Sequence, residues 1–373
     1  MMGMWIGGTH HELLQMKAFH CDQCASLVFF ENVQCVRCQH ALGFLPAVIN
    51  LSALEPAGDG TWRALTPAAR GRNYRQCANG RQHQVCNWLI PAEDSASFCV
   101  SCRLNEVIPD LTVANNRDLW QKLEIAKRRA IYTLLRLRLP TEGVPNENRP
   151  PLRFRFLGDP PGGPPVMTGH DEGVITINVV EADDGERERR RVALREPFRT
   201  LLGHLRHEIA HYYWGELVAN TSHLRRFREL FGDDTRDYAT ALQAYYEQGA
   251  PSDWQMDHVS AYAASHPWED WAETSAHYFH IVDTIETAAS FGVALTPRHP
   301  DAKAMTADPK SVSEWDAGFD RILENWLPLT YALNELNRGM GLPDLYPFVL
   351  SAPAIEKLRF VHEVLNVRSD QRR

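Results

Sequence analysis

The stretch His207-Glu208-Ile209-Ala210-His211 lies within a run of apolar residues at helical spacing, and it decides how the chain is interpreted. Residues four apart lie on one face of a helix, so both imidazoles can reach one Zn²⁺ ion. The glutamate between them can take a proton from a metal-bound water molecule. Chance rarely supplies this pattern, so it predicts that His207 and His211 bind zinc and that Glu208 acts as a general base.

A third metal ligand is expected from a second helix, because catalytic zinc takes three protein ligands and keeps one open position. The helix that carries the motif is predicted from Pro197 to Glu216. No third histidine follows the motif at the short interval that is typical of metzincins. The second predicted helix, from Pro267 to Ala289, begins with several carboxylates. One of them can bind the metal while another accepts a hydrogen bond from a liganding imidazole. Spacing alone leaves three ligand candidates, which are Glu269, Asp270 and Glu273.

The segment from Tyr262 to Glu273 resembles the catalytic domain of anthrax lethal factor and its relatives among the gluzincin metallopeptidases. That group has a Glu-x-x-Ala-Glu segment with a tyrosine seven residues before its first glutamate. The matching residues here are Glu269, Ala272, Glu273 and Tyr262. The resemblance implies that Glu269 binds zinc, that Glu273 supports the site, and that the Tyr262 hydroxyl stabilises the oxyanion. Four nearby histidines are expected to be structural: His258, His266, His277 and His280.

The eight cysteines form two groups, and all of them lie between residues 21 and 102. The first group is Cys21-x2-Cys24-x10-Cys35-x2-Cys38, which has the spacing of a zinc ribbon. The second group is Cys77-x8-Cys86-x12-Cys99-x2-Cys102, in which His83 could replace Cys77 or Cys86. We predict one structural zinc ion in each group, and therefore three zinc ions per chain with the catalytic one. Thioredoxin-like redox chemistry is the alternative, but no βαβ pattern surrounds either group.

Composition and charge exclude several classes of protein. The 373 residues carry 47 acidic and 39 basic side chains and are 44% hydrophobic, which excludes a wholly disordered or fibrous chain. The net charge of −8 disfavours a non-specific nucleic-acid binder. No apolar run approaches the roughly 18 residues of a membrane span, and no secretory signal is recognisable. We expect a location in the reducing cytoplasm, where clustered cysteines usually hold metal.

The whole layout resembles a family of bacterial zinc-binding metallopeptidases with an N-terminal zinc-ribbon region followed by an HExxH domain. The resemblance is carried by the eight cysteines, Cys86-Asn87-Trp88, Ser101-Cys102-Arg103-Leu104-Asn105, Ile108-Pro109-Asp110, the HExxH motif and Trp268-Glu269-Asp270-Trp271-Ala272-Glu273. It implies an α+β fold: a mainly helical, gluzincin-like zincin domain with a small antiparallel sheet, preceded by a double zinc-ribbon module. The strand candidates are Leu152 to Leu157 and Val174 to Val180. The expected divisions are an extension at 1–15, the zinc ribbons at 16–110 and the zincin domain at 111–373.

These observations predict a zinc-dependent metallopeptidase whose partner is a peptide or protein substrate, with no membrane contact. The strand Val174 to Val180 is expected at the sheet edge, where an extended substrate could add as a further strand. The basic stretch Trp62 to Gln82 is a candidate surface for protein or nucleic acid, with a solvated loop as the simpler interpretation. Two other functions stay open, which are a non-catalytic zinc-ribbon adapter or regulatory protein and a zinc amidase on the same scaffold.

Overall fold

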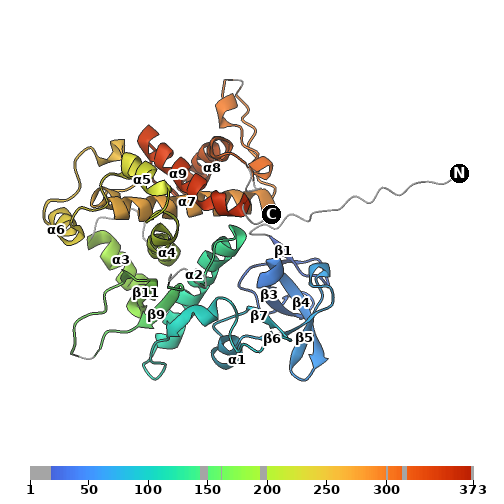
Figure 1. Cartoon of the computed structure of the whole chain (residues 1–373). Helices are drawn as coiled ribbons and strands as arrows, with labels where there is room; N and C mark the ends of the chain where they lie inside the picture. Colours follow the sequence, from blue (N-terminus) through green and yellow to red (C-terminus); the bar gives the residue numbers. More distant parts are fainter. Residues whose placement is uncertain are drawn as a thin grey trace.

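The fold joins an N-terminal region of short strands to a larger helical region (Figure 1). The computed structural model describes residues 18–142, 150–160, 162–193, 200–299, 301–312 and 317–370. The expected extension at 1–15 and the predicted helix start at Pro197 lie outside these residues. The mixture of helices and sheet, with a zinc-ribbon-like region first, agrees with the fold class predicted from the sequence.

The N-terminal region contains two sheets. The smaller is an antiparallel pair, β1 (Phe19–His20) with β2 (Leu27–Val28). The larger has five strands in the order β3-β4-β5-β6-β7, with every neighbouring pair antiparallel. Its strands are β3 (Ala41–Leu45), β4 (Asn50–Gly58), β5 (Thr61–Ala64), β6 (Asn73–Gln76) and β7 (Leu89–Pro91), and the short helix α1 (Ala78–His83) lies between the last two. The basic stretch from Trp62 to Gln82 therefore contains two strands and part of a helix, not a single loop.

The sheet of the helical region is mixed, so the expectation of an antiparallel sheet was wrong. Its four strands have the order β10-β11-β9-β8: β10 (Gly169–Asp171), β11 (Val174–Asn178), β9 (Arg153–Leu157) and β8 (Asn105–Val107). The central strand β9 is parallel to both of its neighbours, and only β10 with β11 is antiparallel. The reason lies in the connections, because the long helix α2 between β8 and β9 gives the chain the crossover that a parallel pair needs.

The strand β11 lies inside the sheet, so the expectation that it forms the edge was also wrong. A two-residue turn folds β10 back onto β11, and both turn residues have positive φ, 43° at Glu172 and 86° at Gly173. Turns of this kind match the twist of a hairpin. The three-residue strand β10 is too short to be recognised from the sequence, and it takes the edge position that was expected for β11.

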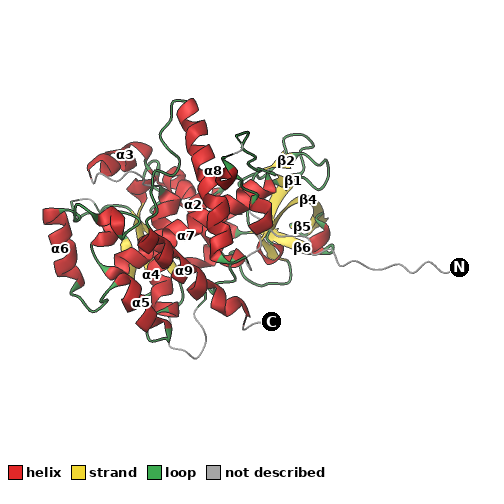
Figure 2. Ribbon diagram, turned by 90° about the horizontal axis from the view of Figure 1, so that it is seen from above, coloured by secondary structure: helices red, strands yellow, loops and turns green. Residues whose placement is uncertain are grey.

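The helical region is built around α7, which lies among the other long helices (Figure 2). The helices are α2 (Asn116–Arg136), α3 (Asp184–Ala193), α4 (Leu201–Leu217), α5 (His223–Phe231), α6 (Tyr238–Gln248), α7 (Pro267–Ser290), α8 (Phe319–Gly339) and α9 (Ala352–Asp370). The most extensive helix–helix contact is between α4 and α7, the two helices that carry the predicted metal ligands. No helix in the described part of the chain is long and apolar enough to cross a membrane.

One hydrophobic core extends through both regions, and α2 connects them (Figure 1). The Tyr132 ring on α2 packs 5.6 Å from Phe30 and 6.0 Å from Phe44, between ring centroids. The next residue of α2 contacts α7, since the Thr133 hydroxyl donates a 2.7 Å hydrogen bond to Asp283. The zinc-ribbon region thus packs directly against the helix that supports α7.

Candidate active site

Side-chain caps begin both helices that carry the predicted metal ligands, α4 and α7. The Thr200 hydroxyl accepts a 2.9 Å hydrogen bond from the Gly203 amide and caps α4. His266 caps α7 in the same way, since its Nδ1 accepts a 3.1 Å hydrogen bond from the Trp268 amide. Proline follows at the first position of α7, where its missing amide hydrogen costs nothing. These caps place Glu269 in the first turn of α7, facing the buried side of α4.

Three candidate ligand atoms form a small triangle. Nε2 of His207 lies 3.1 Å from Nε2 of His211. Oε2 of Glu269 lies 3.0 Å from the first nitrogen and 3.5 Å from the second. Tetrahedral zinc with bonds of about 2.0–2.1 Å holds such atoms about 3.3 Å apart. The triangle therefore has the size of a zinc site with three protein ligands, and these three residues form one of the groups able to hold a metal ion.

The Glu269 carboxylate has one oxygen paired and one free. Its Oε1 accepts a 2.6 Å hydrogen bond from the Tyr238 hydroxyl on α6. Its Oε2 is buried, with the side chain only 1% exposed, and it accepts no hydrogen bond from the part of the chain that the structure describes. Burial would raise the pKa of Glu269, but the two imidazoles hold it well below its usual value. A buried, ionised oxygen without a hydrogen bond is a suitable metal ligand. Tyr238 was not found from the sequence, where no local pattern connects it to the motif.

Glu273 contacts the imidazole of His207 on the side away from the triangle. Its Oε1 lies 2.7 Å from Nδ1 of His207, which directs the other ring nitrogen toward the metal position. The Ser260 hydroxyl donates a 2.6 Å hydrogen bond to the second oxygen of Glu273. The structure thus brings Glu273 to the position that the resemblance implies for a supporting residue. Ser260, like Tyr238, was not found from the sequence.

Asp270 turns away from this group. Its Oδ2 accepts a 2.6 Å hydrogen bond from Nζ of Lys357 and lies 3.0 Å from Nδ1 of His258. Asp270 is completely buried, and the side chain of Lys357 is only 5% exposed. This carboxylate neutralises a buried cation from α9, and it is not among the residues grouped around the candidate metal position.

The four other histidines near α7 have partners of their own. His266 caps the helix, and His258 faces Asp270. Nδ1 of His277 lies 2.5 Å from the Tyr346 hydroxyl, and Nδ1 of His280 lies 2.6 Å from the Arg206 guanidinium. Among the described residues, none of these histidines belongs to a metal-binding group.

Glu208 lies beside the triangle and contacts a third histidine of α4. Its Oε1 lies 3.2 Å from Nε2 of His204, whose Nδ1 lies 2.7 Å from Oε2 of Glu181. Burial would lower the pKa of His204, but the two carboxylates raise it to about 9. Burial would raise the pKa of Glu208, but His204 and the motif histidines lower it. The sequence does contain a signal for His204, because it precedes Glu208 by one helical turn on the same face.

Aromatic side chains enclose the site. The Tyr262 ring, in a short 3₁₀-helix (Tyr262–Ala264), lies 6.0 Å from the His207 ring. The Trp268 ring covers His211 at 3.9 Å, and His170 on β10 lies 6.3 Å from the same imidazole. Tyr238 and Trp268 also line a neighbouring pocket, together with Trp214, Asp234, Arg236 and His266. The edge strand and this pocket therefore border the candidate metal position.

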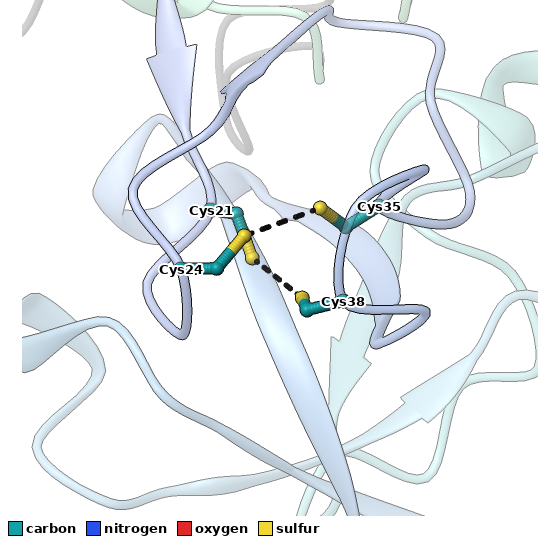
Figure 3. A group of neighbouring side chains, drawn as sticks. All are labelled: Cys21, Cys24, Cys35 and Cys38. Carbon is teal, nitrogen blue, oxygen red and sulfur yellow. Dashed lines mark hydrogen bonds between the residues drawn. The ribbon is translucent and has the colours of Figure 1, made fainter.

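The first cysteine group has the geometry of a four-thiolate metal site (Figure 3). Sγ of Cys21 lies 3.5 Å from Sγ of Cys38, and Sγ of Cys24 lies 3.6 Å from Sγ of Cys35. Zinc–sulfur bonds of about 2.3 Å in a tetrahedral site hold sulfurs about 3.8 Å apart. All four cysteines are free thiols. The four sulfurs therefore surround a space of the right size for one zinc ion.

The two CxxC turns of this group share one backbone shape. The Ala25 amide donates a 2.8 Å hydrogen bond to the Cys21 carbonyl, and the Gln39 amide donates a 2.9 Å hydrogen bond to the Cys35 carbonyl. Ala25 and Gln39 each follow the second cysteine of a pair, and both have positive φ, 57° and 62°. The matching turns bring two thiolates from each side to the same point.

The second cysteine group is more deeply buried and lies against α2. It consists of Cys77, Cys86, Cys99 and Cys102, and the sulfurs of Cys86 and Cys99 are 3.7 Å apart. His83 lies outside the group, with its ring 5.6 Å from Trp120. Arg128 on α2 is 4% exposed; burial would lower the pKa of its guanidinium, but the nearby cysteine thiolates and Glu124 raise it. Four thiolates around Zn²⁺ would carry a net charge of −2, and this buried cation offsets part of it.

Comparisons with known proteins identify the family of this chain. Residues 116–364 match the family described as "Putative zinc-binding metallo-peptidase", and residues 18–113 match a zinc-ribbon domain. The chain belongs to this family of zinc-binding metallopeptidases, which confirms the resemblance inferred from the whole layout. It is 42% identical over 352 residues to proteins of Mycobacterium tuberculosis and Mycobacterium bovis, each named only as an uncharacterized protein. The alignment covers 94% of this chain and 96% of each relative. No solved structure matches the chain.

Proposed function

We propose that this protein is a zinc-dependent peptidase of the gluzincin type that hydrolyses peptide bonds with a metal-activated water molecule. The observation that carries the proposal is the triangle of His207, His211 and Glu269, with Glu208 beside it and the buried Oε2 of Glu269 lacking a hydrogen bond. A purely structural zinc site has no use for a neighbouring general base. The ionised Glu208 therefore favours catalysis over an adapter role.

In this proposal each residue of the site has one task. His207, His211 and Glu269 hold the metal, and Glu273 fixes the ring of His207 through its Nδ1. When bound, zinc supplies a water molecule of lowered pKa and polarises the scissile carbonyl. Glu208 accepts the proton of that water and passes it to the leaving amine.

A phenol near the metal position is proposed to stabilise the oxyanion. Tyr262 is the residue that the resemblance assigns to this task, and its ring faces His207. Burial raises the pKa of Tyr262 well above the usual value for tyrosine, so its hydroxyl stays protonated and can donate a hydrogen bond. We assign this role to Tyr262 and not to Tyr238, because the Tyr238 hydroxyl already donates to Glu269.

The substrate is proposed to lie along β10, the edge strand of the mixed sheet. An extended peptide can add to a free edge through main-chain hydrogen bonds. His170 on β10 lies close to His211, so a peptide on this edge would pass the candidate metal position.

We further propose one structural zinc ion in each cysteine group, in a module at 16–110 that precedes the catalytic domain at 111–373. A reducing cytoplasm would keep the thiols available for metal. The stretch from Trp62 to Gln82 remains a proposed contact surface for protein or nucleic acid.

Metal analysis and a peptide screen test the proposal together. The purified protein should contain three zinc ions per chain and cleave members of an internally quenched peptide library. His207→Ala should lose one zinc ion, whereas Glu208→Gln should keep all three and lose about 10²- to 10⁴-fold in kcat. Cleavage of non-peptide amides alone would favour the amidase. Equal behaviour of wild type and Glu208→Gln in every assay would contradict the proposal and favour an adapter.

A further inference from the structure

His204 links the proposed general base to a second buried carboxylate. It lies on α4 one turn before His207, and its two ring nitrogens contact Glu181 at 2.7 Å and Glu208 at 3.2 Å. Glu181 belongs to the 3₁₀-helix Val179–Ala182 that follows β11, and it is 4% exposed. The Thr168 hydroxyl donates a 2.5 Å hydrogen bond to its other oxygen. The result is a carboxylate–imidazole–carboxylate chain that leads from the sheet to the site.

The geometry determines which form of His204 satisfies both contacts. An ionised carboxylate only accepts hydrogen bonds, and a neutral imidazole has a single N–H to donate. Both contacts are hydrogen bonds at once only when the ring carries two N–H groups. The imidazolium is also favoured by charge, because two buried carboxylates face one ring and their negative charge raises its pKa.

We propose that His204 is a positioning residue for catalysis: as an imidazolium anchored by Glu181, it fixes one oxygen of Glu208 and leaves the other oxygen for the attacking water. This inference rests on the proposed function, because it assigns Glu208 the role of general base. Among the described residues, no hydrogen bond or ion pair is formed by the second oxygen, Oε2, of Glu208. A carboxylate that is hydrogen-bonded through one oxygen keeps one orientation, whereas a carboxylate without that hydrogen bond would rotate among several orientations.

Glu181 has a separate task in this arrangement. When Glu208 takes the proton of the water, it becomes neutral and no longer balances the charge of His204. Glu181 then remains as the counter-charge, so the partly buried cation is never left unpaired during the reaction. The series of contacts from Glu181 through His204 to Glu208 therefore keeps His204 protonated while Glu208 gains and loses a proton.

Kinetics of matched variants test the positioning role. His204→Gln and Glu181→Gln should each lower kcat about 10- to 100-fold on a peptide that the wild type cleaves, with KM and three zinc ions unchanged. The kcat of the double variant should be no lower than that of His204→Gln alone, because Glu181 acts on Glu208 only through His204. His362→Gln is the control, since it removes a histidine that contacts the Tyr278 hydroxyl at 2.9 Å, on a different helix. A kcat unchanged in His204→Gln, or a loss that comes with loss of zinc, would overturn the inference.

A second measurement needs no substrate. Nitrogen-15 NMR of histidine-labelled, zinc-loaded protein at pH 7 should show both ring nitrogens of His204 protonated, and Glu181→Gln should abolish this signature. A neutral His204 in the wild type would overturn the inference, even if Glu208→Gln proves the peptidase function. If Glu208→Gln retains full activity while His204 is an imidazolium, the proposed function fails and with it the catalytic role of His204.

Discussion

The hydroxyl of Tyr238 donates a 2.6 Å hydrogen bond to Oε1 of Glu269, whose other oxygen faces both motif histidines. The two residues come from different helices, α6 and α7, so the contact fixes the carboxylate across a tertiary interface. Because the Tyr238 hydroxyl already fixes this carboxylate, the Glu269 side chain need not become ordered when its Oε2 binds a metal ion. Tyr238 would therefore support the proposed metal site by orienting one of its ligands, without being a ligand itself.

Replacement of Tyr238 by phenylalanine should weaken the catalytic zinc site about 10- to 100-fold, because the carboxylate loses the partner that orients it. Zinc release to a chelator measures this effect, and the two cysteine sites should be unaffected. Tyr331→Phe is a matched control, since Tyr331 is a 54% exposed tyrosine on α8. Equal zinc release from Tyr238→Phe and wild type would contradict this prediction.

Variants of the adjacent acidic residues should separate metal binding from stability. Glu269→Gln should lose one zinc ion per chain. Asp270→Asn should keep all three and unfold about 3–5 kcal/mol more easily, because Lys357 would be left as a buried, unpaired cation. Zinc analysis and denaturant unfolding measure the two effects. If Asp270→Asn lost one zinc ion and Glu269→Gln kept all three, Asp270 and not Glu269 would be the third ligand.

Arg128 should matter for the second cysteine site and not for the first. Arg128→Met removes the buried guanidinium beside Cys86, Cys99 and Cys102, and we expect one zinc ion per chain to be released about tenfold faster. The first cysteine site in the same molecule is an internal standard. Arg129→Met serves as a second control, because Arg129 is half-exposed and pairs with Glu31. If Arg128→Met instead released all of its zinc ions faster than wild type by the same factor, the substitution would have destabilised the protein as a whole.

Stability should fall at alkaline pH in a way that depends on His204. The pKa of His204 is raised from 6.5 to about 9 in the folded protein, so its stabilising contribution is complete below about pH 6.5. That contribution is lost as the pH rises through 9. The free energy of unfolding should therefore decrease from pH 7 to 10 more steeply in wild type than in His204→Gln. Parallel curves for the two proteins would contradict the raised pKa.

Features that depend on local spacing were predictable from the sequence. The helices α4 and α7 were predicted from the sequence, and the apolar residues of α4 recur with helical periodicity. The pairing of His207 with His211 follows from the same rule, and the cysteine groups follow from their spacing. His204 could have been found in this way too, since it lies four residues before Glu208.

Features that depend on tertiary contacts were not predictable. Tyr238 and Ser260 reach the site from other parts of the chain, and no spacing rule relates them to their partners. The direction of β9 relative to β8 depends on the path of α2, which the residues of either strand do not encode. The edge position of β10 depends on a turn of two residues. Each of these features requires the packed structure.

The strand β8 has a consequence for how the molecule unfolds. It lies between the last cysteine and α2, yet it pairs with β9 in the sheet beside the metal position. A shortened chain beginning at residue 116 would lack this strand and leave the edge of β9 that pairs with β8 without its partner. The zinc-ribbon region and the peptidase region therefore share one folding unit, so heat or denaturant should melt them in a single cooperative transition.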